Sequence, residues 1–273
     1  MANKKTAAIS NIEVKKQKKL DDLFDDWKRF ISTKDKVNNG QRAKISPVDC
    51  FASDGFFPGY YSKENKIKIL FIGRETRSIS GGFNFVETSR EFFENAHYPK
   101  IKNRLTNKNN FWRHILKIAY GIQKGGIPFN KIHSSCIKIA DEMIENNNFG
   151  FAVINISKYS NDSKKKWQLN KNLAYRFIND SELAKTKFLQ KEIKILEPDI
   201  IITANLWDAG FGDTLELCFP GLELKHSEKY NIEYCKEYNL NGKNIKLINT
   251  YHFSAYKSDK ECFYDPIRKI VFN

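Results

Sequence analysis

The segment IKILFIGRETR, residues 67–77, passes from a run of large apolar residues directly into a loop of alternating charges. Apart from Lys68 the run is continuously apolar, which is typical of a strand buried on both faces of a parallel sheet. Three further runs of this kind occupy residues 151–156, 199–204 and 245–250. We therefore expect four parallel strands, of which residues 67–72 form the first.

Helical patterns lie between these runs. One follows Asn110, which we expect to cap it, and presents an apolar face through residue 122; others cover residues 139–144 and 189–196. Alternation of strand and helix predicts a doubly wound α/β domain: three-layer αβα, with a central four-stranded parallel sheet. The turn signal Asn241-Gly242 predicts a hairpin into the last strand, and Asp265-Pro266 predicts a final helix.

The N-terminal part of the chain differs in composition from the rest. Residues 1–19 contain six lysines against the single acid Glu13, and we expect a basic flexible arm there. Residues 20–273 are expected to form a single domain with an N-terminal helical and aromatic extension over residues 20–65. Within it, residues 47–62 are rich in aromatics, glycine and proline, so they either pack on the core or offer a stacking surface.

A formal net charge of +14 favours a polyanionic partner, most often nucleic acid. An alternative is that the many Lys, Asn and Ile residues reflect an AT-rich coding bias. Two basic segments, residues 100–108 and 164–167, could follow a nucleic-acid strand or could be solvated loops.

Cysteine usage and hydropathy limit the class of protein further. The five cysteines are scattered and odd in number, so neither disulfides nor a structural zinc site is expected. No run approaches eighteen apolar residues, and no secretory signal is recognisable at the N-terminus. We expect a cytoplasmic monomer without a cofactor, without a metal and without membrane association.

Polar residues follow every predicted strand. They include Arg74, Glu75 and Arg77 after the first, Asn155 at the end of the second, Asn205 after the third, and His252 after the fourth. Ligands of open parallel sheets bind beyond the carboxyl ends of the strands, so a functional site is predicted at this edge. The alternative is that such loops carry capping side chains for the helices that follow.

In this order the segments resemble the uracil-DNA glycosylase superfamily. The matching residues are Gly73-Arg74-Glu75-Thr76, then Asn155, then Thr250-Tyr251-His252-Phe253-Ser254; residues 188–204 are also similar, and the resemblance spans about residues 67–255. Thr76 and Phe253 stand where the family motifs have proline, and the cysteines of its iron–sulfur members are absent. The resemblance implies a four-stranded parallel sheet flanked by helices.

It also implies roles for individual residues. Glu75 would orient a water and stabilise the cationic sugar, while His252 would donate a hydrogen bond to the base oxygen. Asn155 would read the base edge, Gly73 would belong to the same base-binding site, and Phe85 or Phe83 would stack on the flipped base. The expected phosphate contacts are Arg74, Arg77, Lys158 and Ser254. In the alternative interpretation Glu75 pairs with its neighbouring arginines, Asn155 caps a strand, His252 is a loop histidine and Phe85 belongs to the core.

The resulting expectation is a hydrolase that cleaves the N-glycosidic bond of a uracil-type or modified base in DNA after base flipping. Its partner would be DNA, either single-stranded or carrying altered bases. Two alternatives remain: a nucleic-acid-binding or sensing protein with the same fold but no catalysis, or an enzyme that binds a small nucleotide or nucleoside.

Overall fold

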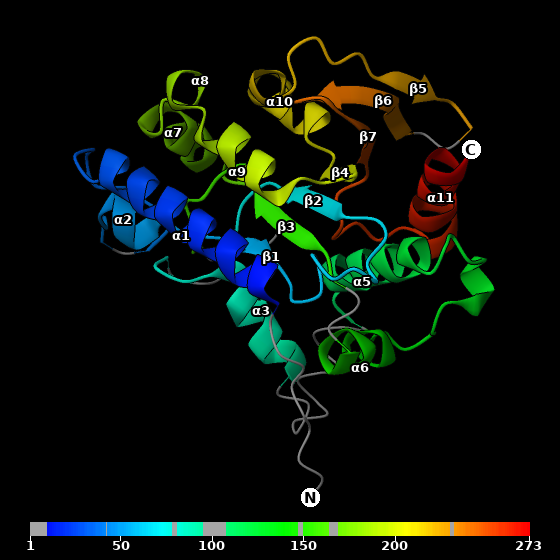
Figure 1. Ribbon diagram of the computed structural model, residues 1–273. Coiled ribbons are helices and arrows are strands. Elements are labelled where there is room, and N and C mark those ends of the chain that lie inside the picture. Colours follow the sequence, from blue (N-terminus) through cyan, green and yellow to red (C-terminus); the bar gives the residue numbers. More distant parts are fainter. Residues whose placement is uncertain are drawn as a thin grey trace, which may run out of the picture.

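The computed structural model describes residues 10–41, 43–77, 81–94, 108–146, 150–163, 169–229 and 232–273 (Figure 1). The predicted basic segments at residues 100–108 and 164–167 lie largely or wholly outside these ranges. The helices are α1 (Asn11–Ile31), α2 (Pro47–Cys50), α3 (Phe85–Glu94), α5 (Asn110–Gln123), η1 (Phe129–Lys131), α6 (Cys136–Asn146), α7 (Lys171–Asp180), α8 (Leu183–Thr186), α9 (Phe188–Leu196), η2 (Trp207–Phe211), α10 (Gly212–Cys218), η3 (Asp259–Tyr264) and α11 (Asp265–Phe272).

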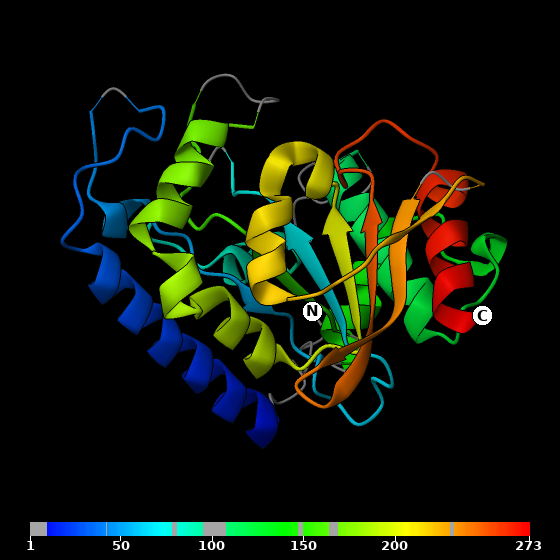
Figure 2. The same ribbon diagram turned by 90° about the horizontal axis from the view of Figure 1, so that it is seen from above.

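The sheet is mixed and has seven strands, in the order β1-β3-β2-β4-β7-β6-β5. Their bounds are β1 (Gly55–Phe56), β2 (Ile69–Gly73), β3 (Ala152–Asn155), β4 (Ile200–Ala204), β5 (Lys225–Ser227), β6 (Ile232–Leu240) and β7 (Lys243–Thr250). The four predicted strands are β2, β3, β4 and β7, and they pair in parallel at the centre. In Figure 2 the arrowheads of β2 and β4 point the same way.

The prediction of a sheet with only four parallel strands is therefore wrong, although the four predicted strands do form its parallel centre. β1, from the aromatic segment, pairs antiparallel with β3 at one side, and β6 and β5 continue the sheet antiparallel at the other. The hairpin at Asn241-Gly242 is confirmed: both residues have positive φ, 53° and 83°, as a two-residue turn between twisted strands requires.

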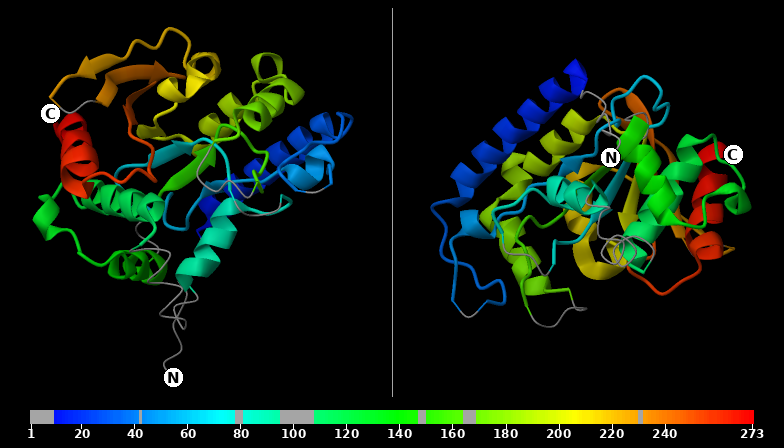
Figure 3. Two further views of the ribbon diagram at one scale, coloured as in Figure 1. Left: turned by 180° about the vertical axis from the view of Figure 1, so that it is seen from behind. Right: turned by 90° about the horizontal axis from the view of Figure 1, so that it is seen from below.

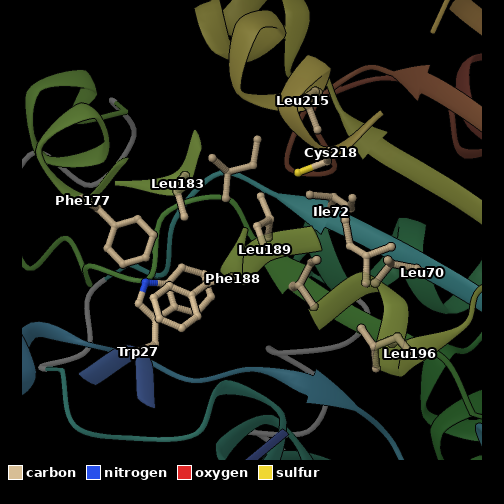
Figure 4. Close-up of a cluster of buried hydrophobic side chains, with 14 of the residues drawn as sticks. Trp27, Leu70, Ile72, Phe177, Leu183, Phe188, Leu189, Leu196, Leu215 and Cys218 are labelled. Carbon is tan, nitrogen blue, oxygen red and sulfur yellow. The ribbon is translucent and has the colours of Figure 1, made fainter. Parts of the chain in front are cut away.

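Alternate strand residues face two separate hydrophobic cores, so helices cover both sides of the sheet. Leu70 and Ile72 of β2 pack with residues of α1, α7, α9 and α10. Ile69 and Phe71 pack with residues of α5, α6 and α11 on the opposite side, which Figure 3 shows from behind. In Figure 4 the ring of Trp27 from α1 stacks on Phe188 from α9, with centroids 5.0 Å apart.

The flexible arm predicted for residues 1–19 is corrected in part, because residues 11–19 belong to α1. Ser10 and Glu13 form a capping box that starts this helix, in which each side chain binds the other's backbone. The Glu13 carboxylate also accepts a hydrogen bond from the Gly59 backbone at 2.7 Å. Lys16 pairs with Glu197 at 2.8 Å, so even the lysine-rich part of α1 is tied to the domain.

The aromatic segment of residues 47–62 packs into the core instead of forming a stacking surface. Phe51, Phe57 and Tyr60 are completely buried. Phe51 lies edge-on to Trp27, with centroids 5.8 Å apart. The extension is therefore part of the same packed body as the sheet.

A buried ionic triad joins the helical layer to the end of β3. The Lys158 ammonium group lies 2.6 Å from Asp54 Oδ1 and 2.9 Å from Glu192 Oε2, and all three side chains have at most 1% exposure. Burial lowers the pKa of Lys158, but the two carboxylates outweigh burial and the pKa is raised overall. Burial and the charge of Asp54 raise the pKa of Glu192 well above its usual range.

This triad corrects the interpretation of Lys158 as a phosphate contact. Its ammonium group is enclosed by two carboxylates and by the rings of Phe24 and Trp27, 5.8 and 5.7 Å away. No phosphate could reach it without dismantling the packing of α1. Asp54 also accepts a hydrogen bond from the Asn155 backbone at 2.6 Å, so the triad fixes where β3 ends.

Replacing Lys158 with methionine should lower the free energy of unfolding by about 3–5 kcal/mol at neutral pH, because two buried carboxyl groups lose their only ammonium partner. Urea unfolding at neutral pH measures it. Lys194→Met, an exposed lysine on α9, is the matched control and should change stability by less than about 0.5 kcal/mol. A loss for Lys158→Met no larger than for the control would contradict the triad's importance.

Candidate functional site

The carboxyl ends of three parallel strands bring the predicted site residues to one edge of the sheet. Gly73 at the end of β2 is in register with Asn155 at the end of β3. Thr250 at the end of β7 is in register with Ala204 of β4, and His252 follows two residues later. Loops from three distant parts of the chain therefore start at the same edge.

Gly73 and Asn155 form a close backbone-to-amide contact. A Cβ atom on Gly73 would lie 2.5 Å from Asn155 Oδ1, so only glycine leaves room for this amide. Asn155 is 4% exposed, and its Nδ2 has no hydrogen-bond partner among the residues that the structure describes. Buried amide donors are normally paired, so an unpaired one at a strand end indicates a place where a ligand could accept.

Glu75 is a buried carboxylate whose two oxygens differ in their hydrogen bonding. Oε1 accepts hydrogen bonds from Asn161 Nδ2 at 2.8 Å, Arg77 Nε at 3.1 Å and the Asn170 backbone at 3.2 Å. Oε2 is buried without a partner in the described part of the chain. Burial raises the pKa of Glu75, and the contacts from Asn161, Asn170 and Arg77 oppose that rise without cancelling it.

His252 is held as a neutral hydrogen-bond donor. Its Nδ1 accepts from the Ser254 backbone N–H at 3.2 Å, so the ring proton is on Nε2. Burial, together with the positive charges of Arg74 and Arg77, lowers the pKa of His252 to about 4. At neutral pH this imidazole is uncharged and its Nε2–H is available to an acceptor.

The two arginines connect the carboxylate to the imidazole. Arg77 pairs with Glu75, and Arg74 donates from Nη2 to the Asn205 carbonyl at 3.2 Å. Burial lowers the pKa of Arg74, partly offset by the charge of Glu75. Both guanidinium groups lie close enough to His252 to lower its pKa. They are thus built into the site, and their predicted contact with phosphate stays a prediction.

Phe85 and Ser254 occupy less distinctive positions. The Phe85 ring stacks on Trp112 at 5.6 Å between centroids and stands edge-on to Phe111, so its packing favours the core alternative over base stacking. Ser254 contributes its backbone N–H to His252 and its carbonyl to Asn110, at 3.5 Å. Asn109, one residue earlier than predicted, caps α5, which leaves Asn110 for this loop.

Unsatisfied buried polar atoms gather at this edge. Within the described ranges, five side-chain atoms on the loops after β2, β3 and β7 or at the ends of these strands have no hydrogen-bond partner: Arg74 Nε, Glu75 Oε2, Thr76 Oγ1, Asn155 Nδ2 and Thr250 Oγ1. Such groups are costly to bury and are expected where a polar ligand or water supplies the missing contacts.

Sequence reasoning missed Asn161 and Asn170, which hold Glu75, and Asp54, which holds Asn155. Asn161 stands in the polar run after the second predicted strand, which was a usable signal. Nothing in the sequence pairs Asn170 with Glu75, 95 residues away. Among the described residues no group of three His, Cys, Asp or Glu side chains could hold a metal ion, and no helix there is long and apolar enough to cross a membrane.

An open, polar cavity of about 490 Å³ is connected to Glu75 through one of its lining residues. Its lining comes from the loop before α2 and from the start of α7: Lys36, Val37, Asn38, Gly40, Lys44, Asn170, Asn172, Leu173 and Arg176. Asn170 is the link, since its backbone N–H donates to Glu75. Asn155 and His252 do not line this cavity.

A scan against models of protein families finds no match, and no curated protein matches the sequence significantly.

Proposed function

We propose that this protein is a DNA glycosylase-like hydrolase, a divergent relative of the uracil-DNA glycosylase superfamily that releases a base from a flipped nucleotide. The observation that carries the proposal is the meeting of Glu75, Asn155 and a neutral His252 at one sheet edge, each with an unused polar atom directed to no described partner. The parallel pairing of β3, β2, β4 and β7, flanked by helices, supports the same relationship.

The roles follow from the charges that develop when an N-glycosidic bond breaks. The bonding electrons move onto the base, and the Nε2–H of His252 would donate to the base oxygen that becomes negative. The sugar becomes cationic, and ionised Glu75 would stabilise it and accept a proton from the water that adds to the sugar carbon. Asn155 would donate from Nδ2 to the base edge. A neutral imidazole suits this role because it donates without titrating near neutral pH.

A second candidate is a nucleic-acid-binding protein that has the fold but no catalysis. The donors on Glu75 Oε1 favour it, because Arg77, Asn161 and Asn170 hold this carboxylate as they would a structural one. Phe253, at a motif proline position, is also fully buried and packs edge-on against Phe71 with centroids 5.5 Å apart.

Glu75→Gln and His252→Ala should each slow base release at least about 100-fold, because each removes charge stabilisation from the transition state. The assay uses oligonucleotides that carry uracil and other altered bases, followed by alkaline cleavage of abasic sites. Glu87→Gln and His226→Ala, both exposed, are the matched controls and should leave the rate unchanged. Equal rates in all four variants would refute the catalytic proposal. DNA binding without any release in the wild type would favour the second candidate.

The acid limb of the pH–rate profile should follow Glu75. Its pKa lies above the usual 4.5, and His252, with a pKa of about 4, stays neutral over that range. Activity should therefore fall as pH decreases through the Glu75 pKa. Arg77→Gln removes a positive charge that lowers this pKa, so the limb should move to higher pH. Arg29→Gln, exposed on α1, should not move it. An unmoved limb in Arg77→Gln would exclude Glu75 as the titrating group.

The cavity beside Glu75 offers a path for a phosphate backbone. Lys36 and Lys44 are exposed on its rim and form no hydrogen bond or ion pair with another described residue. Arg176, by contrast, is paired with Asp180 at 2.8 Å. Two uncommitted ammonium groups on an open polar surface suit phosphate contacts, which supply affinity without sequence reading.

The double variant Lys36→Glu, Lys44→Glu should weaken binding of a labelled single-stranded oligonucleotide by about tenfold or more, and should reduce the slope of log affinity against log salt by about 2. Fluorescence anisotropy at several salt concentrations measures both. The double variant Lys225→Glu, Lys236→Glu on β5 and β6 carries the same charge change far along the sheet and should have a smaller effect. Equal losses of affinity in the two double variants would indicate a diffuse electrostatic attraction of DNA to the whole surface, and would contradict a phosphate path along this cavity.

A further inference from the structure

His114 lies behind the His252 loop and is completely buried on α5. Its Nδ1 is 2.6 Å from the carbonyl oxygen of Phe253. A carbonyl oxygen can only accept, so Nδ1 carries a proton and donates. The ring also stacks on Phe263 at 3.8 Å between centroids, which fixes its plane.

The other ring nitrogen faces an anion. His114 Nε2 lies 2.9 Å from Asp259 Oδ1. Burial raises the pKa of Asp259, but hydrogen bonds and charge from His114, Lys117 and Arg113 outweigh it and hold the pKa far below its usual range. Asp259 is therefore ionised, and its carboxylate faces Nε2 of His114 at ion-pair distance.

One peptide unit joins His114 to His252. The Phe253 carbonyl that accepts from His114 and the Ser254 N–H that donates to His252 Nδ1 are the two ends of the same peptide group. A hydrogen bond to the carbonyl oxygen polarises a peptide group and makes its N–H a stronger donor. An ion-pair contact between Asp259 and His114, followed by two hydrogen bonds through this peptide group, thus connects Asp259 to His252.

We propose that His114 is a positioning residue for His252: by donating to the Phe253 carbonyl, it strengthens the Ser254 N–H bond to Nδ1 and keeps the His252 proton on Nε2. The functional meaning of this arrangement rests on the proposed role of His252 as a donor to the leaving base. The arrangement itself is a property of the free protein and can be measured without a substrate.

Holding the loop in place is a different role for His114 from strengthening the Ser254 N–H bond to His252. Asn110, one turn earlier on α5, also holds the loop, donating from Nδ2 to the carbonyls of Ser254 and Ala255 at 3.5 and 3.3 Å. Asn110 therefore holds the loop through other carbonyl groups than the Phe253 carbonyl that His114 contacts. Asn110→Ala therefore loosens the loop while leaving the His114 contact intact, and it serves as the matched control.

The charged groups around His114 come from three elements. Asp259 of η3 faces it, Arg113 and Lys117 flank it on α5, and His252 lies beyond the peptide group. Cys136 of α6 is close to the same cluster, and burial raises the pKa of its thiol to about 11, so it stays neutral. Below neutral pH, His252 is therefore the group whose titration the experiment follows.

The experiment is NMR of protein labelled with nitrogen-15 in histidine, recorded from pH 3.5 to 8 for the wild type, His114→Phe, His114→Gln and Asn110→Ala. In the wild type, His252 should have its proton on Nε2 and titrate near pH 4. In His114→Phe, the tautomers should mix and the titration midpoint should rise by about half a pH unit or more, toward the ordinary value. His114→Gln retains an N–H donor and should restore the wild-type tautomer.

The result that overturns the inference is an unchanged His252 tautomer and midpoint in His114→Phe, or a change in Asn110→Ala as large as in His114→Phe. If His114→Phe does not fold, His114→Gln and Asp259→Asn decide: the first should resemble the wild type and the second should shift His252 in the direction of mixed tautomers. The spectra do not depend on base release. Absence of glycosylase activity would therefore refute the proposed function, whereas only the histidine spectra test the role of His114.

Discussion

The buried contact among Asp54, Lys158 and Glu192 is the interaction on which the arrangement of this molecule depends. It joins the aromatic segment before β2, the loop after β3 and helix α9, three parts of the chain that also meet through hydrogen bonds and apolar packing. Asp54 uses its second oxygen to hold the Asn155 backbone, so the same contact decides where β3 stops and where the amide of Asn155 lies. Removing charges from water is costly, and only a fully paired cluster is tolerated there.

At this edge of the sheet, one physical cause shifts the pKa values of an acid and of an imidazole in opposite directions. Burial acts on Glu75 and His252 alike and favours the neutral form of each, which raises one pKa and lowers the other. Arg77 then acts on both, lowering the pKa of the acid and of the imidazole. The outcome is an acid and a neutral imidazole on sequence-distant loops at the same edge of the sheet, which is a combination that acid–base and electrostatic catalysis use.

The central strands, the hairpin, α9 and the meeting of strand ends were predictable because each has a local signal: continuous apolar runs, Asn-Gly, and a helix stopped before Pro198. The tertiary partners were not. Lys158 looks like any lysine after a strand, and only the fold shows that Trp27 and Phe24 cover it. The lysines of α1 resemble a solvated arm because the contact that ties this helix to the domain joins Glu13 to Gly59, 46 residues away in the sequence. Within the candidate site the sequence indicated Glu75, Asn155 and His252 but not the residues that hold them.

The two edge strands of the sheet affect whether copies of this protein can pair through their sheets. One margin is β1, only two residues long, and the other is β5, three residues long with Lys225 and His226 exposed. A margin this short, or one that carries lysine, is a poor template for strand addition by another chain, and natural proteins use both devices against aggregation. The strands that widen the sheet beyond its parallel core are therefore the ones that disfavour edge-to-edge pairing between copies.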